Sequence, residues 1–191
     1  DIGNTNIVAA VYNGEQQMGI WRFASDAALP HDGYQRLLAN TLGDAATAND
    51  GAIIASVVPI LTPLLLDATK KLLECTPMLV GGSDLDLGIK INIDQPEQAG
   101  SDRLVNAVGA RKSHILPAII LDFGTATTLD LIGVDGTYEG GIIAPGVNLS
   151  VDALEQAAAQ LPPIKVRPWP DDLPILGKNT VAAMESGVFW G

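Results

Sequence analysis

Apolar residues along the chain follow two spacings, one typical of buried strands and one typical of helices. Mainly apolar runs at Ile7–Tyr12, Gly51–Val58 and Pro117–Leu121 predict strands. Apolar positions at helical spacing predict one helix over Gly33–Leu42 and another from Thr62, the expected N-cap residue, to about Cys75. Strands that come first and are followed by alternating strands and helices are typical of an α/β fold.

Later helices are predicted from residues that favour a helix start. Ser101 is a good N-cap residue, and Asp102 then falls in the first turn, where the helix dipole favours its negative charge. Another helix is expected from Leu149 to about Gln160. The five prolines of Leu161–Leu176 predict an extended loop, and Thr180 is placed to cap a further helix.

A glycine turn beside an aspartate occurs twice. Asp122-Phe-Gly-Thr125 separates two apolar segments, which predicts a hairpin whose turn offers successive backbone N–H groups to an anion. Asp1-Ile-Gly-Asn-Thr5 also precedes an apolar strand. A carboxylate beside such a turn repels phosphate unless a cation lies between them, so the pairing indicates metal-bound phosphate. Either motif alone also fits a hairpin with a capping aspartate; the two together favour a duplicated domain with a polyphosphate between the turns.

The segment Gly100–Asn106 allows two interpretations. Asp102 and Asn106 are four residues apart, so they share one face of the predicted helix. The segment is either a capped helix with an acidic first turn or a helix start that presents a carboxylate to a ligand.

Composition and charge limit the classes of partner. The chain has 191 residues, of which 47% are hydrophobic and 17% charged, so it has enough apolar residues for a core. A net charge of −11 disfavours nucleic acid, whose binding needs a basic face. The apolar runs are too short to cross a bilayer, so we expect no membrane partner. Cys75 is the one cysteine and excludes an intrachain disulfide, and we take the cytoplasm as the default location.

Six motifs in order resemble those of the type III pantothenate kinases, which belong to the superfamily of acetate and sugar kinases, heat-shock chaperones and actin. The resemblance covers almost the whole chain. The motifs are Asp1-x-Gly-Asn-Thr, Ser56-Val-Val-Pro59, Gly100-x-Asp-Arg103 with Asn106, Asp122-Phe-Gly-Thr-Ala-Thr-Thr-x-Asp130, Gly140-Gly-x-Ile-x-Pro-Gly146 and Asn179-Thr180-x-x-Ala-Met-x-Ser-Gly187.

This resemblance implies a fold and an activity. The fold would be α/β, with two duplicated ribonuclease-H-like domains, residues 1–110 and 111–191, and a nucleotide cleft between them. Asp1 opens a turn with no strand before it and Gly191 falls within a helical pattern, so we expect further residues at both ends and a truncated second domain. The implied activity is ATP-dependent phosphorylation of pantothenate to 4'-phosphopantothenate, the first step of coenzyme A biosynthesis, by a homodimer.

The resemblance also implies roles for individual residues. Asp102 matches the general base, and Asp122 matches the ligand of a monovalent cation, potassium or ammonium. The pantothenate contacts would come from Gly100, Ser101, Asp102, Arg103 and Thr180. The contacts to ATP, bound with Mg²⁺, would come from Asp1, Ile2, Gly3, Asn4, Thr5, Asn6, Ile7, Val8 and Thr125.

One position departs from the family pattern. Family members often have tyrosine seven residues before the first glycine of Gly-x-Asp-Arg, and this chain has Ile93 there. Two alternative functions stay open. The chain could be another kinase or hydrolase of the superfamily, acting on a sugar or a polyphosphate, or a nucleotide-binding regulator without catalysis.

Overall fold

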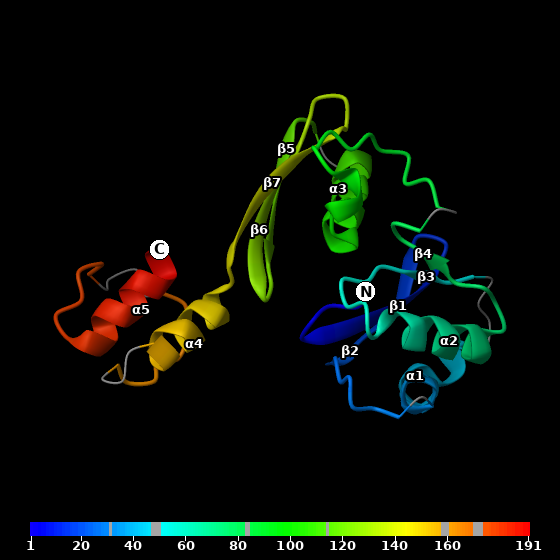
Figure 1. The fold of residues 1–191 in the computed structure, drawn as a ribbon, viewed down its shortest axis with the longest axis horizontal. Helices are drawn as coiled ribbons and strands as arrows, with labels where there is room; N and C mark the ends of the chain where they lie inside the picture. Colours follow the sequence, from blue (N-terminus) through cyan, green and yellow to red (C-terminus); the bar gives the residue numbers. More distant parts are fainter. Residues whose placement is uncertain (31, 47–50, 83–84, 114, 158–160, 170–173) are drawn as a thin grey trace. The chain divides into compact units, whose positions relative to one another are not determined.

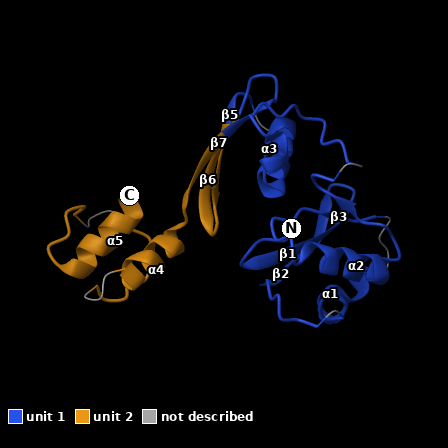
Figure 2. Cartoon of the chain, viewed as in Figure 1, with its two compact units in different colours: residues 1–118, 132–140 blue, residues 119–131, 141–191 orange. Residues whose placement is uncertain are grey.

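The computed structural model describes residues 1–30, 32–46, 51–82, 85–113, 115–157, 161–169 and 174–191 (Figure 1). Helices and small sheets make a mixed α/β fold, as expected. The chain divides into two compact units (Figure 2). We call Asp1–Ala118 with Ile132–Gly140 the first unit, and Ile119–Leu131 with Gly141–Gly191 the second unit.

The first unit begins with an antiparallel hairpin. Strand β1 (Asn6–Asn13) pairs with β2 (Gln16–Ala24), in a register that places Asn6 opposite Ala24. The turn contains Gly14, whose φ of 59° lies in the left-handed region that glycine adopts without a steric penalty. The strand predicted from the apolar run at Ile7–Tyr12 is confirmed.

Two helices follow the hairpin. Helix α1 (Gly33–Leu42) has the predicted bounds, and the short 3-10 helix η1 (Gly43–Ala46) follows it. Helix α2 (Thr62–Leu73) begins at the residue that we expected to cap it. That expectation is wrong, because Leu61 is the N-cap residue and the hydroxyl of Thr62 donates a hydrogen bond to the carbonyl of Val58 at 3.0 Å.

The strand predicted over Gly51–Val58 is shorter than expected and belongs to a second sheet, which is parallel. It contains β3 (Ile53–Ile54) and β4 (Met78–Leu79), so only two residues of the apolar run Gly51–Val58 form a regular strand. Ile2 links this region to the hairpin, since it bridges Ile7 in antiparallel fashion and Ser56 in parallel fashion.

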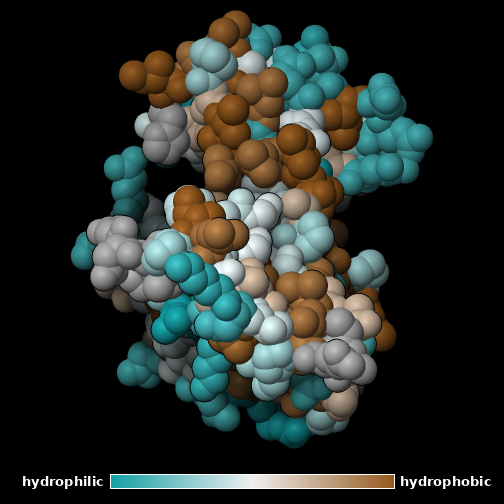
Figure 3. Space-filling model, turned by 90° about the vertical axis from the view of Figure 1, so that its left-hand side faces the viewer, coloured by the Kyte–Doolittle hydropathy of each residue, from teal (hydrophilic) through white to brown (hydrophobic). Residues whose placement is uncertain are grey.

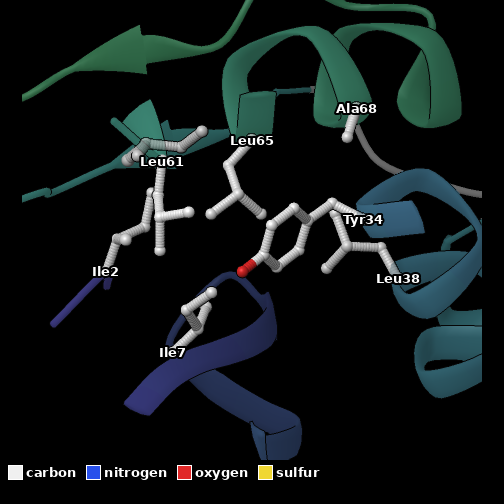
Figure 4. Close-up of a cluster of buried hydrophobic side chains, with 8 residues drawn as sticks. Ile2, Ile7, Tyr34, Leu38, Leu61, Leu65 and Ala68 are labelled. Atoms are coloured by element: carbon white, nitrogen blue, oxygen red, sulfur yellow. The ribbon is translucent and has the colours of Figure 1, made fainter. Parts of the chain in front are cut away.

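The core of the first unit forms where these strands meet α1 and α2 (Figure 4). Tyr34 is fully buried, and its hydroxyl donates to the carbonyl of Asp26 and accepts from the N–H of the same residue, both at 2.9 Å. Burying one Ile, Leu or similar side chain contributes about 1.5–3 kcal/mol. The cluster comprises Ile2, Ile7, Tyr34, Leu38, Ile54, Leu61, Leu65 and Ala68.

The first unit also contains helix α3 (Ser101–Ser113), which follows the 3-10 helix η2 (Pro96–Gln98). The segment Ile132–Gly140 contributes a turn in which the N–H of Gly133 donates to the carbonyl of Thr137 at 2.8 Å. Tyr138, just after this turn, forms a parallel bridge with Ile91.

A three-stranded sheet contributes residues to both units. Its strands are β5 (Ala118–Phe123), β6 (Ala126–Ile132) and β7 (Tyr138–Pro145), in the order β5-β6-β7. The predicted hairpin around Gly124–Thr125 is therefore confirmed.

The helices of the second unit are α4 (Val147–Ala157) and α5 (Thr180–Trp190). Helix α4 matches the helix predicted from Leu149, whose expected last turn, residues 158–160, lies outside the described residues. The predicted loop has no regular structure over residues 161–169 and 174–176, and its residues 170–173 lie outside the described part. Apolar side chains are exposed in this unit, and Figure 3 shows apolar surface on the face that it draws. They include Ile119, Leu121, Phe123, Ile142 and Ile143.

No helix in the described ranges is both long enough and apolar enough to cross a membrane.

Candidate active site

The first glycine turn is fixed by backbone hydrogen bonds and by one serine. The N–H of Gly3 donates to the carbonyl of Asn6 at 3.0 Å, so Asn4 and Thr5 form the exposed tip. Ser25 donates from its hydroxyl to the carbonyl of Gly3 at 2.5 Å and from its N–H to the carbonyl of Thr5 at 3.0 Å. A tip with a fixed backbone that is open to solvent is suited to binding an anion.

Ile2 connects this turn to the segment around Ser56. Its N–H donates to the carbonyl of Ala55 at 2.8 Å, and its carbonyl accepts from the N–H of Val57 at 3.1 Å. The side chain of Ile2 is 2% exposed, so the backbone just before the turn is anchored in the core. Asp1 itself is exposed.

Ser56 in turn holds the start of α3. The buried hydroxyl of Ser101 donates to the carbonyl of Ser56 at 2.8 Å. The prediction that Ser101 caps the helix is therefore wrong: its hydroxyl is used in this contact, and the carbonyl of Gly100 accepts the first helical hydrogen bond, from Leu104 at 3.1 Å. The structure thus links the first glycine turn to the Gly100–Arg103 segment through the intervening residues Ala55–Val57.

Asp102 lies in the first turn of α3, as predicted, and is half-buried. Its Oδ1 accepts a hydrogen bond from the N–H of Arg103 at 2.8 Å. A Cβ atom on Gly100 would lie 2.5 Å from the same oxygen and 3.7 Å from Cγ1 of Val57. The carboxylate therefore folds back over the helix N-terminus, and a Cβ atom at position 100 would come too close to it.

Arg103 points to a different neighbour. Its guanidinium carbon lies 5.7 Å from the centre of the Tyr138 ring, within the range of a cation–π interaction. Tyr138 is 1% exposed, so this interaction takes place against a buried ring.

The second glycine turn lies in the second unit and is packed against the start of α4. The N–H of Gly124 donates to the carbonyl of Ala126 at 2.9 Å, and the N–H of Gly146 donates to the carbonyl of Thr125 at 3.1 Å. A Cβ atom on Gly146 would lie 2.4 Å from the carbonyl oxygen of Gly124 and 2.3 Å from that of Thr125, both backbone atoms. Only glycine fits at this contact, and Thr125 is held there with an exposed side chain.

Two other predicted residues lie in the second unit. Asp122 is exposed on β5, two residues before Gly124. Thr180 is the first residue of α5, and the prediction that it caps this helix is wrong. The capping residue is Asn179, whose side-chain oxygen accepts from the N–H of Ala182 at 2.9 Å. The exposed hydroxyl of Thr180 is not needed as the cap.

A cavity of about 310 Å³ in the first unit is unsuited to a triphosphate. It lies along β1, β3, α1 and α2, and within the described residues Asp1 contributes the only charged side chain of its lining. A mostly apolar wall cannot compensate the charge of phosphate groups. The exposed glycine turn, rather than this cavity, has the properties of an anion site.

A divalent metal ion at this site would have few ligands from the protein. Over the described ranges, no three His, Cys, Asp or Glu side chains are grouped as a metal site. Mg²⁺ in nucleotide sites is commonly held by one or two carboxylates together with phosphates and water, so the exposed Asp1 beside the first turn fits that requirement.

Three residues of this arrangement were absent from the predicted site. Ser56 and Gly146 belong to quoted motifs, but their partners are distant in sequence, so spacing alone does not show what they contact. Tyr138 precedes the Gly140-Gly motif and belongs to none of the quoted motifs.

Comparison with known proteins gives the family. The family model described as type III pantothenate kinase matches residues 1–191. The chain belongs to the type III pantothenate kinase family. A type III pantothenate kinase of Paramagnetospirillum magneticum is 46% identical over 195 residues, covering 100% of this chain and 74% of that protein. One of Phenylobacterium zucineum is 45% identical over 192 residues, covering 99% of this chain and 73% of that protein.

A solved structure shows a similar fold. It is that of a Campylobacter jejuni protein described as a member of the Baf family of transcriptional activators. It aligns with 100% of this chain and 72% of its own, with a TM-score of 0.59 and 20% sequence identity. At that identity the likeness concerns the fold alone. Family membership makes the chain a kinase, an enzyme class that uses ATP with a divalent metal.

Proposed function

We propose that the chain transfers the terminal phosphate of ATP to the primary hydroxyl of pantothenate, giving 4'-phosphopantothenate in the first step of coenzyme A biosynthesis. Family membership supports this activity. The observation that carries our assignment of residues is the link through Ser56, which joins the first glycine turn to the carboxylate-bearing start of α3. Phosphate donor and acceptor sites must adjoin for direct transfer, and this link between their candidate residues supports the assignment.

Asp102 is the general base. A primary hydroxyl is a weak nucleophile, and an aspartate that accepts its proton is a recurring part of kinase sites. One oxygen of Asp102 accepts from the N–H of Arg103, which fixes the carboxylate and leaves further lone pairs for the hydroxyl of the substrate. Arg103 binds the substrate carboxylate or the transferred phosphate, because its planar guanidinium makes paired hydrogen bonds to either group.

ATP contacts Asp1–Val8 and Thr125. The turn at Asn4–Thr5 presents backbone to the phosphates, and Thr125 presents an exposed side chain from the second glycine turn. Asp1 would hold Mg²⁺, and the metal would supply charge neutralisation at the phosphates. Asp122 holds potassium or ammonium next to the second turn.

Pantothenate contacts Gly100, Ser101, Asp102, Arg103 and Thr180. Gly100 allows a close approach, since no side chain stands over the start of α3. Ile93, in place of the tyrosine common in the family, lies against β7, with its Cγ2 atom 3.3 Å from the Cβ position of Gly140. An isoleucine cannot donate a hydrogen bond, so a contact that relatives make from this position is replaced here by an apolar one.

The wider organisation that we propose rests on the repeated glycine turn. It comprises two duplicated ribonuclease-H-like domains, residues 1–110 and 111–191, with the nucleotide between them. A homodimer in the cytoplasm, with no nucleic-acid or membrane partner, completes the proposal.

The test is a phosphorylation assay in which pantothenate, a panel of sugars, polyphosphate and water compete as acceptors or substrates. Transfer to pantothenate alone is the expected result. Phosphorylation of a sugar, or hydrolysis of polyphosphate, would assign the chain to another activity of the superfamily. Nucleotide binding without turnover of any acceptor would indicate a regulator without catalysis.

A further inference from the structure

Two hydrogen bonds hold the backbone of Tyr138 in place. Its N–H donates to the carbonyl of Lys90 and its carbonyl accepts from the N–H of Asn92, both at 2.8 Å. The next residue adds a side-chain contact, in which Nδ2 of Asn92 donates to the carboxylate of Glu139 at 2.6 Å. The backbone of Tyr138 is therefore held on both sides, and burial of the ring restricts its rotation.

Arg103 lies over this fixed ring. Its guanidinium carbon is 5.7 Å from the ring centre, and the ring is 1% exposed while Arg103 is half-buried. A cation over an aromatic face is attracted by the ring quadrupole, more strongly when water is excluded. Guanidinium also stacks as a flat group, which restricts the plane in which its five N–H donors lie.

We propose that Tyr138 is a positioning residue: its ring fixes the plane of the Arg103 guanidinium, so that Arg103 presents paired donors to a carboxylate or phosphate of the acceptor. The inference rests on the proposed function, because Arg103 needs an anionic group of the substrate to bind. Tyr138 would thus contribute to the binding of the acceptor although it lies far from Arg103 in sequence. Lysine at position 103 would keep the charge and lose both the flat contact and the paired donors.

One experiment reads the position of Arg103 without using activity. In the full chain labelled with ¹⁵N-arginine, the Nε–H signal of Arg103 is expected to carry a ring-current shift, identified by its loss in Arg103→Lys. The shift should persist in Tyr138→Phe, which keeps the ring, and vanish in Tyr138→Leu. Absence of the shift in the wild type would overturn the proposal whatever the substrate is.

Kinetics then separate positioning from folding. Tyr138→Leu is expected to raise KM for pantothenate by about 3- to 30-fold, the range of a cation–π contact, with KM for ATP unchanged. Tyr138→Phe should behave as the wild type. Tyr34→Leu, which removes another buried ring from the same unit, should lower Tm without a change in KM. In Arg103→Lys, the further change Tyr138→Leu should cost less than it does in the wild type, because the pair is coupled.

The outcomes separate two failures. If Tyr138→Leu lowers only Tm, or its effect is additive with Arg103→Lys, the positioning role is wrong. If the ring-current shift behaves as expected but Arg103→Lys leaves KM for pantothenate unchanged, the ring still positions Arg103, and the proposed role of Arg103 in binding pantothenate is what fails. Should Tyr138→Leu not fold, the Arg103 shift in the wild type and in Tyr138→Phe still decides the positioning claim.

Discussion

Replacing Asp102 by asparagine distinguishes a general base from a helix cap. The structure shows Oδ1 accepting from the N–H of Arg103 at 2.8 Å, and the side-chain oxygen of asparagine can accept the same hydrogen bond. Asparagine is also nearly the same size, so the close approach to Gly100 is kept. What the substitution removes is the charge and the capacity to take a proton.

The two interpretations predict effects of different size. Loss of a positioned general base lowers turnover by roughly 10²- to 10⁴-fold. That range corresponds to about 2.7–5.4 kcal/mol of lost transition-state stabilisation, at about 1.36 kcal/mol for each tenfold. Loss of the favourable charge at the helix N-terminus costs about 0.3–1 kcal/mol of stability. At about 2–4 °C for each kcal/mol, the expected fall in Tm is a few degrees at most.

The assay measures turnover, KM for ATP and Tm on three variants. Asp102→Asn should lose turnover with near-normal Tm and KM for ATP. Asp102→Ala also loses the hydrogen bond to Arg103, so it should lose turnover to a similar extent and about 1 kcal/mol more stability. Asp135→Asn is the matched control, because the carboxylate of Asp135 also accepts a backbone N–H, that of Thr137 at 3.0 Å, and it has no role in the site.

A normal rate with a lowered Tm in Asp102→Asn would refute the reasoning. Asp102 would then be a residue of the helix start only, and the base would have to be sought elsewhere.

Three further changes test other parts of the structure. Gly146→Ala should distort the second glycine turn and raise KM for ATP, because the new Cβ would lie 2.3 Å from the carbonyl oxygen of Thr125. Gly109→Ala is the control: its Cβ would have no atom within 4 Å, so the kinetics should stay unchanged and the stability should rise by about 0.5–1 kcal/mol. Replacing potassium by sodium or a bulky organic cation should lower turnover, because Asp122 is assigned as the ligand of potassium or ammonium. Equal rates in all salts would contradict this role of Asp122. The backbone hydrogen bond from Thr137 lowers the pKa of Asp135 from its ordinary value, so the stabilisation is present above that ordinary value and lost as pH falls through the lowered one. Asp135→Asn should therefore flatten the acid limb of the stability profile, and an unchanged limb would contradict this.

Sequence patterns predicted elements better than contacts. The bounds of α1 followed from the apolar spacing over Gly33–Leu42, because a helix that buries one face must repeat apolar residues at its own period. The hairpin around Gly124 was predicted for a similar reason, since a glycine turn between two apolar runs leaves few other arrangements.

Hydroxyl groups were assigned wrongly because their partners are not local. The rule that serine and threonine cap helices assumes that the nearest backbone N–H is the best partner. Ser101 instead bonds to a carbonyl 45 residues away, and Thr62 bonds back to a carbonyl of the preceding turn. Tyr138 was missed for a related reason, since only the folded chain brings its ring under Arg103.

Ile2 bridges Ile7 of β1 on one side and Ser56 on the other, so its position couples several parts of the first unit. Its backbone groups bond to the segment that holds α3, and its side chain lies in the core. A local opening that frees Ile2 would therefore release the glycine turn and the support of Ser101 in one event. By our assignment, the ATP contacts and the general base would be lost together. A partly opened enzyme would therefore neither bind ATP nor hydrolyse it in the absence of pantothenate.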